Sequence, residues 1–212
     1  MSTRRYEQRL RAEQAEETRR RILDAVYEAL RARPAGSLGL DDIARRARVA
    51  RSTIYLVFGS RAGLFHAFAE DLWARSGFPR LTEAVANSDA REHLRGGIAA
   101  ATRMFAAERD IYRVLHSMAQ LDAESVGGAI ETMENERRGG MEHLARRLDE
   151  DGLLRPDVTV EDATEVLWIL CSFESFDLLH TGRGLPVDRS IELLVTTAER
   201  ALLAPVPTQR RE

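Results

Sequence analysis

Apolar residues recur at intervals of three and four positions along most of the chain. This spacing places them on one face of an α-helix and leaves the remaining faces to polar side chains. No segment shows the alternation with a period of two that is typical of a strand. The pattern predicts an all-α protein of about nine helices, over residues 15–33, 40–47, 51–57, 61–76, 89–107, 109–120, 122–150, 160–181 and 187–203.

Residues 40–58 contain two short predicted helices separated by a three-residue turn. Their apolar positions form a small wedge, made of Leu40, Ile43, Ala44 and Ala47 in the first helix and Ile54, Val57 and Phe58 in the second. The outer faces carry polar side chains, namely Arg46, Arg48, Arg51, Ser52, Thr53 and Tyr55. A helix of this width fits the DNA major groove, where such groups can contact base edges and phosphates.

The same segment resembles the DNA-binding domain of the tetracycline-repressor (TetR/AcrR) family of bacterial transcription regulators. The upstream helix, residues 18–32, is also similar to the first helix of that family, and the resemblance covers residues 15–75. The matching residues are Ile43, Ala44, Ala47, Val49, Thr53, Ile54, Tyr55, Phe58, Ser60, Arg61 and Leu64.

The resemblance implies a homodimeric repressor that leaves a near-palindromic double-stranded DNA operator when a small, mainly hydrophobic molecule binds. It implies groove and phosphate contacts from Arg51, Ser52, Thr53 and Tyr55. It also implies contacts to the DNA backbone from Arg46, Arg48 and Arg61. The helix after residue 60 would carry the ligand signal to the DNA-binding helices.

Three departures from the family pattern concern which DNA sequence is recognised. Arg48 stands where the family usually has Gly, at a turn that often needs left-handed backbone, which costs a non-glycine residue about 1 kcal/mol. Ala50 replaces a Ser or Thr that would cap the second helix, a loss of about 1 kcal/mol. Leu56 and Val57 replace residues that are usually polar or basic.

A Gly-Phe-Pro break at 77–79 predicts a domain boundary, with an N-terminal arm and helix-turn-helix domain over 1–76 and an effector-binding and dimerisation domain over 77–212. The predicted helix 160–181 is apolar on two sides, and the last predicted helix, 187–203, can pair with it. These two helices from each of two chains would form a four-helix interface. The alternative is a monomer that buries both sides internally. The candidate interface residues are Val166, Ile169, Phe176, Ile191, Leu194, Val195 and Ala198.

The second domain is also rich in Met and aromatic residues, which form adaptable, largely apolar pockets. We expect the effector to bind among them, although ordinary core packing is the alternative for each residue. The candidate ligand-binding residues are Met104, Phe105, Tyr112, His116, Met118, Met141, Trp168, Cys171 and Phe173.

Charge is distributed unevenly. Residues 1–62 contain 14 arginines and 8 acidic residues, a net charge of +6, whereas residues 63–212 contain 17 arginines and 26 acidic residues, a net charge of −9. A basic end on an acidic body indicates that one end faces a polyanion. Residues 1–14 contribute four arginines, which suit either an arm on the DNA or a solvated tail.

Nothing in the sequence indicates catalysis, a metal or a cofactor, because the five histidines and the single cysteine have no ligand spacing. No apolar run reaches the length of a membrane span. One cysteine cannot form an internal disulfide, which fits the cytoplasm. The alternative to a regulator is a helical small-molecule sensor or carrier that acts through protein contacts without operator specificity. A third possibility, a small helical enzyme, lacks a recognisable catalytic pair.

Overall fold

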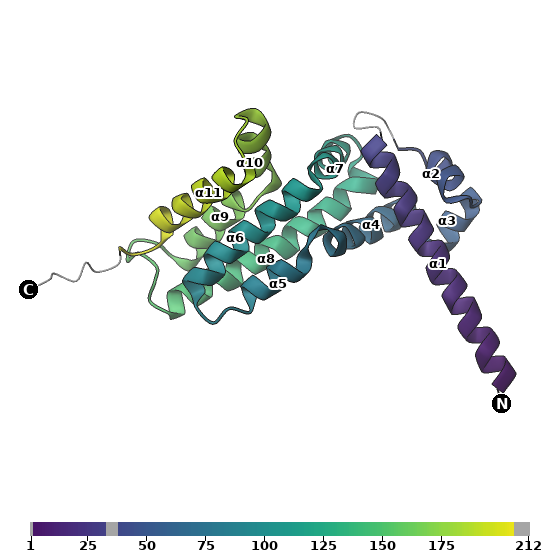
Figure 1. The fold of residues 1–212 in the computed structure, drawn as a ribbon, viewed down its shortest axis with the longest axis horizontal. Helices are drawn as coiled ribbons and strands as arrows, with labels where there is room; N and C mark the ends of the chain where they lie inside the picture. Colours follow the sequence, from purple (N-terminus) through teal and green to yellow (C-terminus); the bar gives the residue numbers. More distant parts are fainter. Residues whose placement is uncertain (1, 33–37, 206–212) are drawn as a thin grey trace, which may run out of the picture. The chain divides into compact units, whose positions relative to one another are not determined.

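The computed structural model describes residues 2–32 and 38–205, and within these residues the chain is helical throughout, without a strand (Figure 1). The all-α prediction is confirmed, but the described residues form eleven α-helices and two π-helical turns rather than nine helices. Their bounds are α1 Ser2–Ala32, α2 Leu40–Ala47, α3 Arg51–Phe58, α4 Arg61–Ser76, α5 Phe78–Val85, α6 Ala90–Ala107, α7 Arg109–Leu121, η1 Ala123–Gly127, α8 Gly128–Glu150, α9 Val160–Leu170, α10 Phe173–Asp177, η2 Leu178–Gly182 and α11 Val187–Leu202.

The helices form two compact units, which we call the head and the body. The head contains residues 1–72 and 110–132, and the body contains residues 73–109 and 133–212. No helix within the described residues is long and apolar enough to cross a membrane.

The head packs α2 and α3 beside α1 (Figure 1). Its apolar wedge buries Leu40, Ile43, Ala44, Ala47 and Ile54, as the 3–4 spacing predicts, whereas Val57 and Phe58 are only half-buried. The largest side chains that the head buries almost completely are Ile22, Leu30, Ile43, Ile54, Leu64, Phe65, Phe68, Leu72 and Tyr112.

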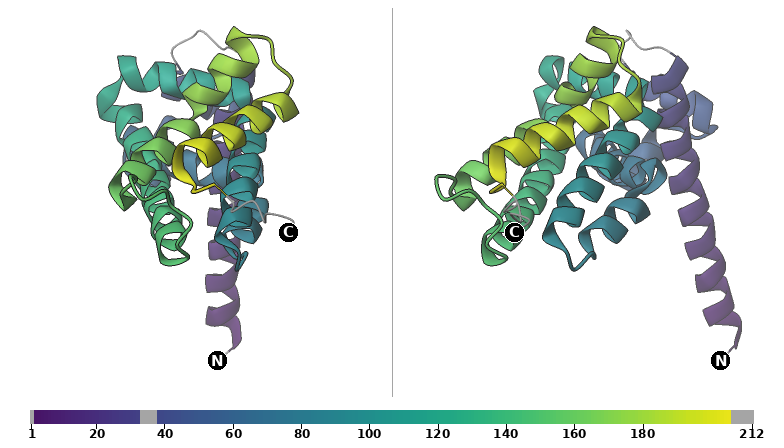
Figure 2. Two further views of the ribbon diagram at one scale, coloured as in Figure 1. Left: turned by 90° about the vertical axis from the view of Figure 1, so that its left-hand side faces the viewer. Right: turned by 60° about the vertical axis from the view of Figure 1, so that its left-hand side comes forward.

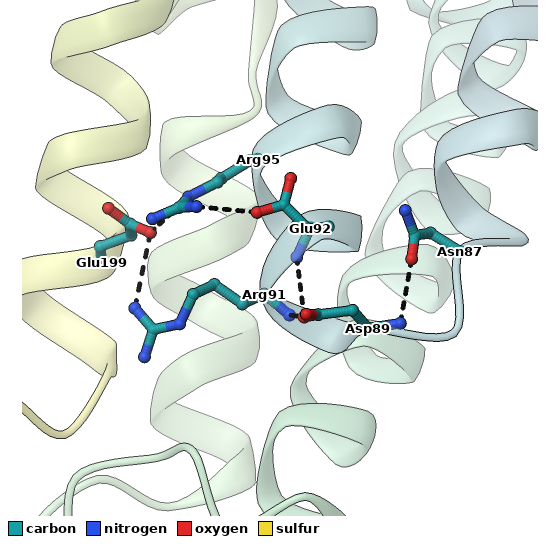
Figure 3. Close-up of polar contacts among 6 residues, drawn as sticks. All are labelled: Asn87, Asp89, Arg91, Glu92, Arg95 and Glu199. Atoms are coloured by element: carbon teal, nitrogen blue, oxygen red, sulfur yellow. Dashed lines mark hydrogen bonds and ion pairs between the residues drawn. The ribbon is translucent and has the colours of Figure 1, made fainter. Parts of the chain in front are cut away.

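The body packs α11 against both α6 and α9, and Figure 2 shows α11 lying across this group. Its core includes Leu94, Leu144, Leu167 and Leu194. Polar contacts also join α6 to α11, since both Arg91 and Arg95 pair with Glu199 (Figure 3).

Side-chain caps start several helices. Thr159 caps α9 and forms a reciprocal capping box with Asp162. The cap of α6 is Asp89, whose carboxylate accepts hydrogen bonds from the backbone N–H groups of Arg91 and Glu92 (Figure 3). An ionised carboxylate suits the positive end of a helix better than a hydroxyl does.

Three predicted helix boundaries are wrong. The helix expected over 160–181 ends at Leu170, because the Ser172 hydroxyl accepts a hydrogen bond from the Ser175 N–H and starts α10. The helix expected from 122 begins with a π-helical turn capped by Asp122. Helix α1 begins at Ser2 rather than near residue 15, so the expected arm or tail is helical, and its residues 6–17 are exposed.

Helix α5 was not predicted. Pro79 occupies its first turn, where a missing N–H costs nothing. Gly77 precedes it with a φ of 106°, a conformation that glycine adopts readily. The predicted break at 77–79 is therefore a sharp turn into a short helix.

Candidate nucleic-acid interface

Each of the two short helices of the head has a buried apolar side and an exposed polar side. In α2 the side chains of Leu40, Ile43, Ala44 and Ala47 are buried, and in α3 only Ile54 is fully buried. Of the other residues of α3, four are exposed and three are half-buried. The outer side carries Arg51, Ser52 and Tyr55, all exposed, while Thr53 is half-buried.

The turn between the helices has the geometry of a Schellman motif. The Arg48 N–H donates to the Arg45 carbonyl at 3.2 Å, and the Val49 N–H donates to the Ala44 carbonyl at 3.0 Å. Arg48 takes the left-handed position, with a φ of 54°, and is the one non-glycine residue with positive φ among those described. The expectation of left-handed backbone at this departure from the family pattern is thus confirmed.

We expect Arg48→Gly to raise the free energy of unfolding by about 1 kcal/mol, because glycine carries no β-carbon to strain in the left-handed region. Chemical denaturation would measure the change. Arg48→Ala is the matched control, since it also removes the guanidinium but keeps the β-carbon. Equal stabilities of the two variants would contradict the strain argument, and an equal fall of DNA affinity in both would place the guanidinium at the DNA.

Several predicted contact residues are already tied into a polar network on the head. The Arg46 Nε donates to Asp42 at 3.0 Å and the Arg51 Nη1 donates to Asp41 at 3.0 Å. The Arg51 guanidinium also lies 6.0 Å from the centre of the Tyr55 ring. A hydrogen bond with Tyr55 and the charge of Asp41 raise the pKa of Arg51. The Arg51–Asp41 pair is exposed, and the Arg46–Asp42 pair is partly buried. Exposed ion pairs are weak and can exchange for phosphate contacts.

The start of α3 confirms the missing cap. Ala50 has extended backbone, with φ −72° and ψ 149°, and provides no side-chain hydrogen bond to the helix. The next helix, α4, has a side-chain cap, because the Ser60 hydroxyl accepts a hydrogen bond from the Gly63 N–H at 2.9 Å.

Arg61, a predicted contact to the DNA backbone, is tied into the head through its guanidinium. Its Nη1 donates to the Leu38 carbonyl at 2.7 Å and its Nε donates to Asp122 at 3.2 Å. Its guanidinium also lies 5.1 Å from the centre of the Phe65 ring. The side chain is 26 % exposed, so these partners compete with the predicted phosphate contact.

The sequence analysis did not identify two residues that make contacts within the head. Arg19 places its guanidinium 5.0 Å from the centre of the Phe58 ring, which joins α1 to the end of α3. Asp122 pairs with Arg61 from 61 positions away. Neither has a signal in local periodicity, since both depend on contacts between distant segments.

The predicted ligand-binding residues fall into both units. Tyr112, His116 and Met118 belong to the head, and Met104, Phe105, Met141, Trp168, Cys171 and Phe173 belong to the body. In the body, the Phe105 and Phe173 rings lie 5.8 Å apart, and Phe173 and Phe176 are neighbours. Cys171 is buried in the core, and burial raises the pKa of its thiol to about 12.

A second group in the body surrounds Trp168. The Arg137 guanidinium lies 5.1 Å from the centre of the indole ring, donates to the Trp168 carbonyl and pairs with Glu134. The indole Nε1 is buried and has no hydrogen-bond partner among the residues that the structure describes.

The predicted interface residues differ in exposure. Ile169 is 55 % exposed, and Val166, Ile191 and Val195 are half-buried. Phe176, Leu194 and Ala198 are buried within the single chain because they pack into the body, so they offer little surface to a second copy.

These features define a class of protein. Two short helices meet at a tight turn, an apolar wedge supports them, and the second helix exposes arginine, hydroxyl and phenol groups. This arrangement is a helix-turn-helix of the DNA-binding type.

Comparisons with known proteins agree with this class. Residues 22–68 match the family model described as bacterial regulatory proteins of the tetR family. The search of curated proteins found no match. Among solved structures, the chain is similar to NalD, the secondary repressor of the MexAB-OprM multidrug efflux pump in Pseudomonas aeruginosa. The two are 25 % identical with a TM-score of 0.69, over 92 % of this chain and 100 % of NalD.

Two further structures are more distant in sequence. A putative TetR-family regulator from Syntrophomonas wolfei is 14 % identical with a TM-score of 0.70, over 87 % of this chain and 94 % of that chain. The ketosteroid transcriptional regulator KstR2 of Mycobacterium tuberculosis is 17 % identical with a TM-score of 0.62, over 88 % of this chain and 95 % of that chain. The family match over residues 22–68 and the fold shared over most of the chain support a TetR-family transcriptional regulator.

Proposed function

We propose that this regulator is a homodimeric cytoplasmic repressor without enzymatic activity, which leaves a near-palindromic operator when a small, mainly hydrophobic molecule binds. The observation that carries the proposal is the outer face of α3, where Arg51, Ser52 and Tyr55 are exposed on a helix held by one buried anchor, Ile54. The net charge of +6 over residues 1–62 supports a polyanionic partner.

The DNA contacts that we propose come from Arg46, Arg48, Arg51, Ser52, Thr53 and Tyr55. Hydroxyl and guanidinium groups at the start of α3 can reach base edges and phosphates. Leu56, which is 86 % exposed on the same short helix, suits an apolar contact with a thymine methyl group. The departure from the family pattern at this position then changes the operator sequence rather than the ability to bind DNA.

The second copy in the proposed dimer is expected to bind along α9 and α11. Ile169 is the exposed apolar residue of α9, and Val166, Ile191 and Val195 are half-buried on the two helices. Burial of such side chains between two copies stabilises a dimer in proportion to the apolar area removed from water.

The effector site is expected in the body, among Phe105, Phe173 and Trp168. The aromatic pair offers apolar surface, and the buried Trp168 N–H supports an effector that bears a hydrogen-bond acceptor. NalD is named as a repressor of a multidrug efflux pump and KstR2 as a ketosteroid regulator, and both names favour a response to an apolar small molecule.

The first experiment is binding of the purified protein to genomic DNA fragments, including the region upstream of its own gene, at two salt concentrations. We expect a tight preference for one near-palindromic site that weakens steeply with salt. Weak, sequence-independent binding would instead favour the sensor or carrier, for which exposed Leu56 and the uncapped α3 are the supporting observations.

Tyr55→Ala should lower operator affinity about tenfold, because the phenol is exposed on α3 and one good DNA contact contributes about 1–3 kcal/mol. Fluorescence anisotropy with the selected site would measure the reduction. Tyr55→Phe separates the hydroxyl from the ring, and helicity and oligomeric state should stay unchanged in both variants. Full affinity in Tyr55→Ala would remove this residue from the proposed contacts.

A further inference from the structure

Arg61 joins three parts of the head through one side chain. Its Nη1 holds the Leu38 carbonyl at 2.7 Å, just before α2, and its Nε donates to Asp122 at 3.2 Å, just after α7. The guanidinium also covers the Phe65 ring of α4. Arginine is suited to this role because its planar group offers several donors in fixed directions.

The Asp122 carboxylate accepts hydrogen bonds from two different parts of the head. One carboxylate oxygen, Oδ1, accepts a hydrogen bond from the Ser125 N–H at 3.2 Å and starts the π-helical turn η1. The other oxygen, Oδ2, accepts the bond from Arg61. One residue pair therefore connects the start of η1 to the start of α4.

The segment that supplies Asp122 lies outside the part of the chain that matches the family model. That match covers residues 22–68, whereas residues 110–132 return to the head from much later in the sequence. The pair Arg61–Asp122 is thus a polar link between the helix-turn-helix and this returning segment.

We propose that Arg61 is a positioning residue for DNA binding, which acts by tying the residues just before α2 and the start of α4 to Asp122. It provides no phosphate contact of its own. When the pair breaks, α2 and α3 are no longer held in a fixed orientation relative to the returning segment, and operator affinity falls. This inference rests on the proposed function, since its readout is operator binding.

Asp122→Asn is the most informative variant because it alters no residue of the DNA-binding face. The asparagine Oδ1 keeps the cap on the Ser125 N–H, while its NH₂ group replaces the oxygen that accepts from Arg61. We expect operator affinity to fall about fivefold to tenfold, in the range of coupling between linked sites. Arg95→Gln, which breaks the ion pair with Glu199 in the body, is the control for removal of an arginine ion pair elsewhere.

The salt dependence of binding separates positioning from phosphate contact. If Arg61 bound a phosphate, Arg61→Gln should reduce the slope of log K against log salt by about 1, whereas a positioning role leaves the slope unchanged. Arg61→Lys keeps the charge but cannot make both bonds in the same geometry, so it should weaken binding nearly as much as Arg61→Gln. All assays are run below the melting transition of each variant.

The double variant Arg61→Gln/Asp122→Asn completes the test. We expect its affinity to fall no further than that of either single variant, because both substitutions remove the same link. Full affinity in Asp122→Asn, or a reduced salt slope in Arg61→Gln, would overturn the proposal. Failure of the wild-type protein to prefer any DNA site would instead overturn the proposed function, so the two failures are distinguishable.

Discussion

Ile54→Ala should lower the free energy of unfolding of the head by about 3 kcal/mol and abolish measurable operator binding. Ile54 is 0 % exposed and is the only residue of α3 that is fully buried among those described. Truncation of such a residue removes apolar packing and leaves a cavity, which costs about 2–5 kcal/mol. The effect on DNA binding exceeds the effect on stability because this residue fixes the helix that carries the proposed contacts.

Leu56→Ala is the matched control for stability alone, since it truncates an aliphatic side chain two positions away in the same helix and Leu56 is itself a proposed DNA contact. Leu56 is 86 % exposed, so its truncation should leave stability within about 0.5 kcal/mol of the wild type. Chemical denaturation, with DNA binding measured in parallel, would compare the two variants. Equal destabilisation by both would show that α3 does not pack through Ile54 alone.

This pair also shows why the helix-turn-helix could be predicted from the sequence. Apolar spacing distinguishes the buried position of Ile54 from the outer position of Leu56, because residues three or four apart share a helix face. The left-handed backbone at Arg48 was expected on other grounds, because the family that the segment resembles usually has glycine there.

Features that depend on distant segments could not be predicted in this way. Arg61 has the local sequence of a phosphate-binding residue at a helix start, yet Leu38 and Asp122 take up its donors. The division of the candidate effector residues between head and body is also non-local, because periodicity gives the buried face of a helix but not the helix that covers it.

Helix breaks were missed where a polar side chain competes with the helical hydrogen bond. Residues 160–181 have continuous apolar periodicity, and Ser172 nevertheless begins a new helix within them. Conversely, α1 extends to Ser2 through a polar segment that has no apolar face. In both cases the hydrophobic pattern indicates which residues are buried, but it does not give the bounds of the helix.

The second prediction with a large expected effect concerns the pH dependence of stability and rests on His93, which is 3 % exposed in the body. Its Nδ1 lies 2.9 Å from Nη1 of Arg147. Because a guanidinium can only donate, Nδ1 must accept, and the neutral imidazole carries its proton on Nε2. Arg147 also donates to the carbonyls of Val85, the last residue of α5, and of Asn87 and Ser88 in the connection to α6.

The surroundings of His93 oppose its protonation. Burial, followed by the positive charges of Arg147 and of His143, lowers the pKa of His93 from 6.5 to about 4. The unfolded chain therefore binds a proton at this residue before the folded chain does. Stability is fully present above pH 6.5 and is lost as the pH falls towards 4, by up to about 3 kcal/mol for a shift of this size.

We expect the free energy of unfolding, measured by chemical denaturation at several pH values, to fall between pH 6.5 and 4 in the wild-type protein. His93→Gln should flatten this part of the profile, because glutamine keeps an acceptor for Arg147 and has no proton to gain. Its stability at pH 7 will be lower if the amide packs less well than the ring, but the slope is the decisive quantity. An unchanged slope in His93→Gln would show that other groups cause the loss of stability at low pH. It would contradict a buried, neutral His93 that accepts a hydrogen bond from Arg147.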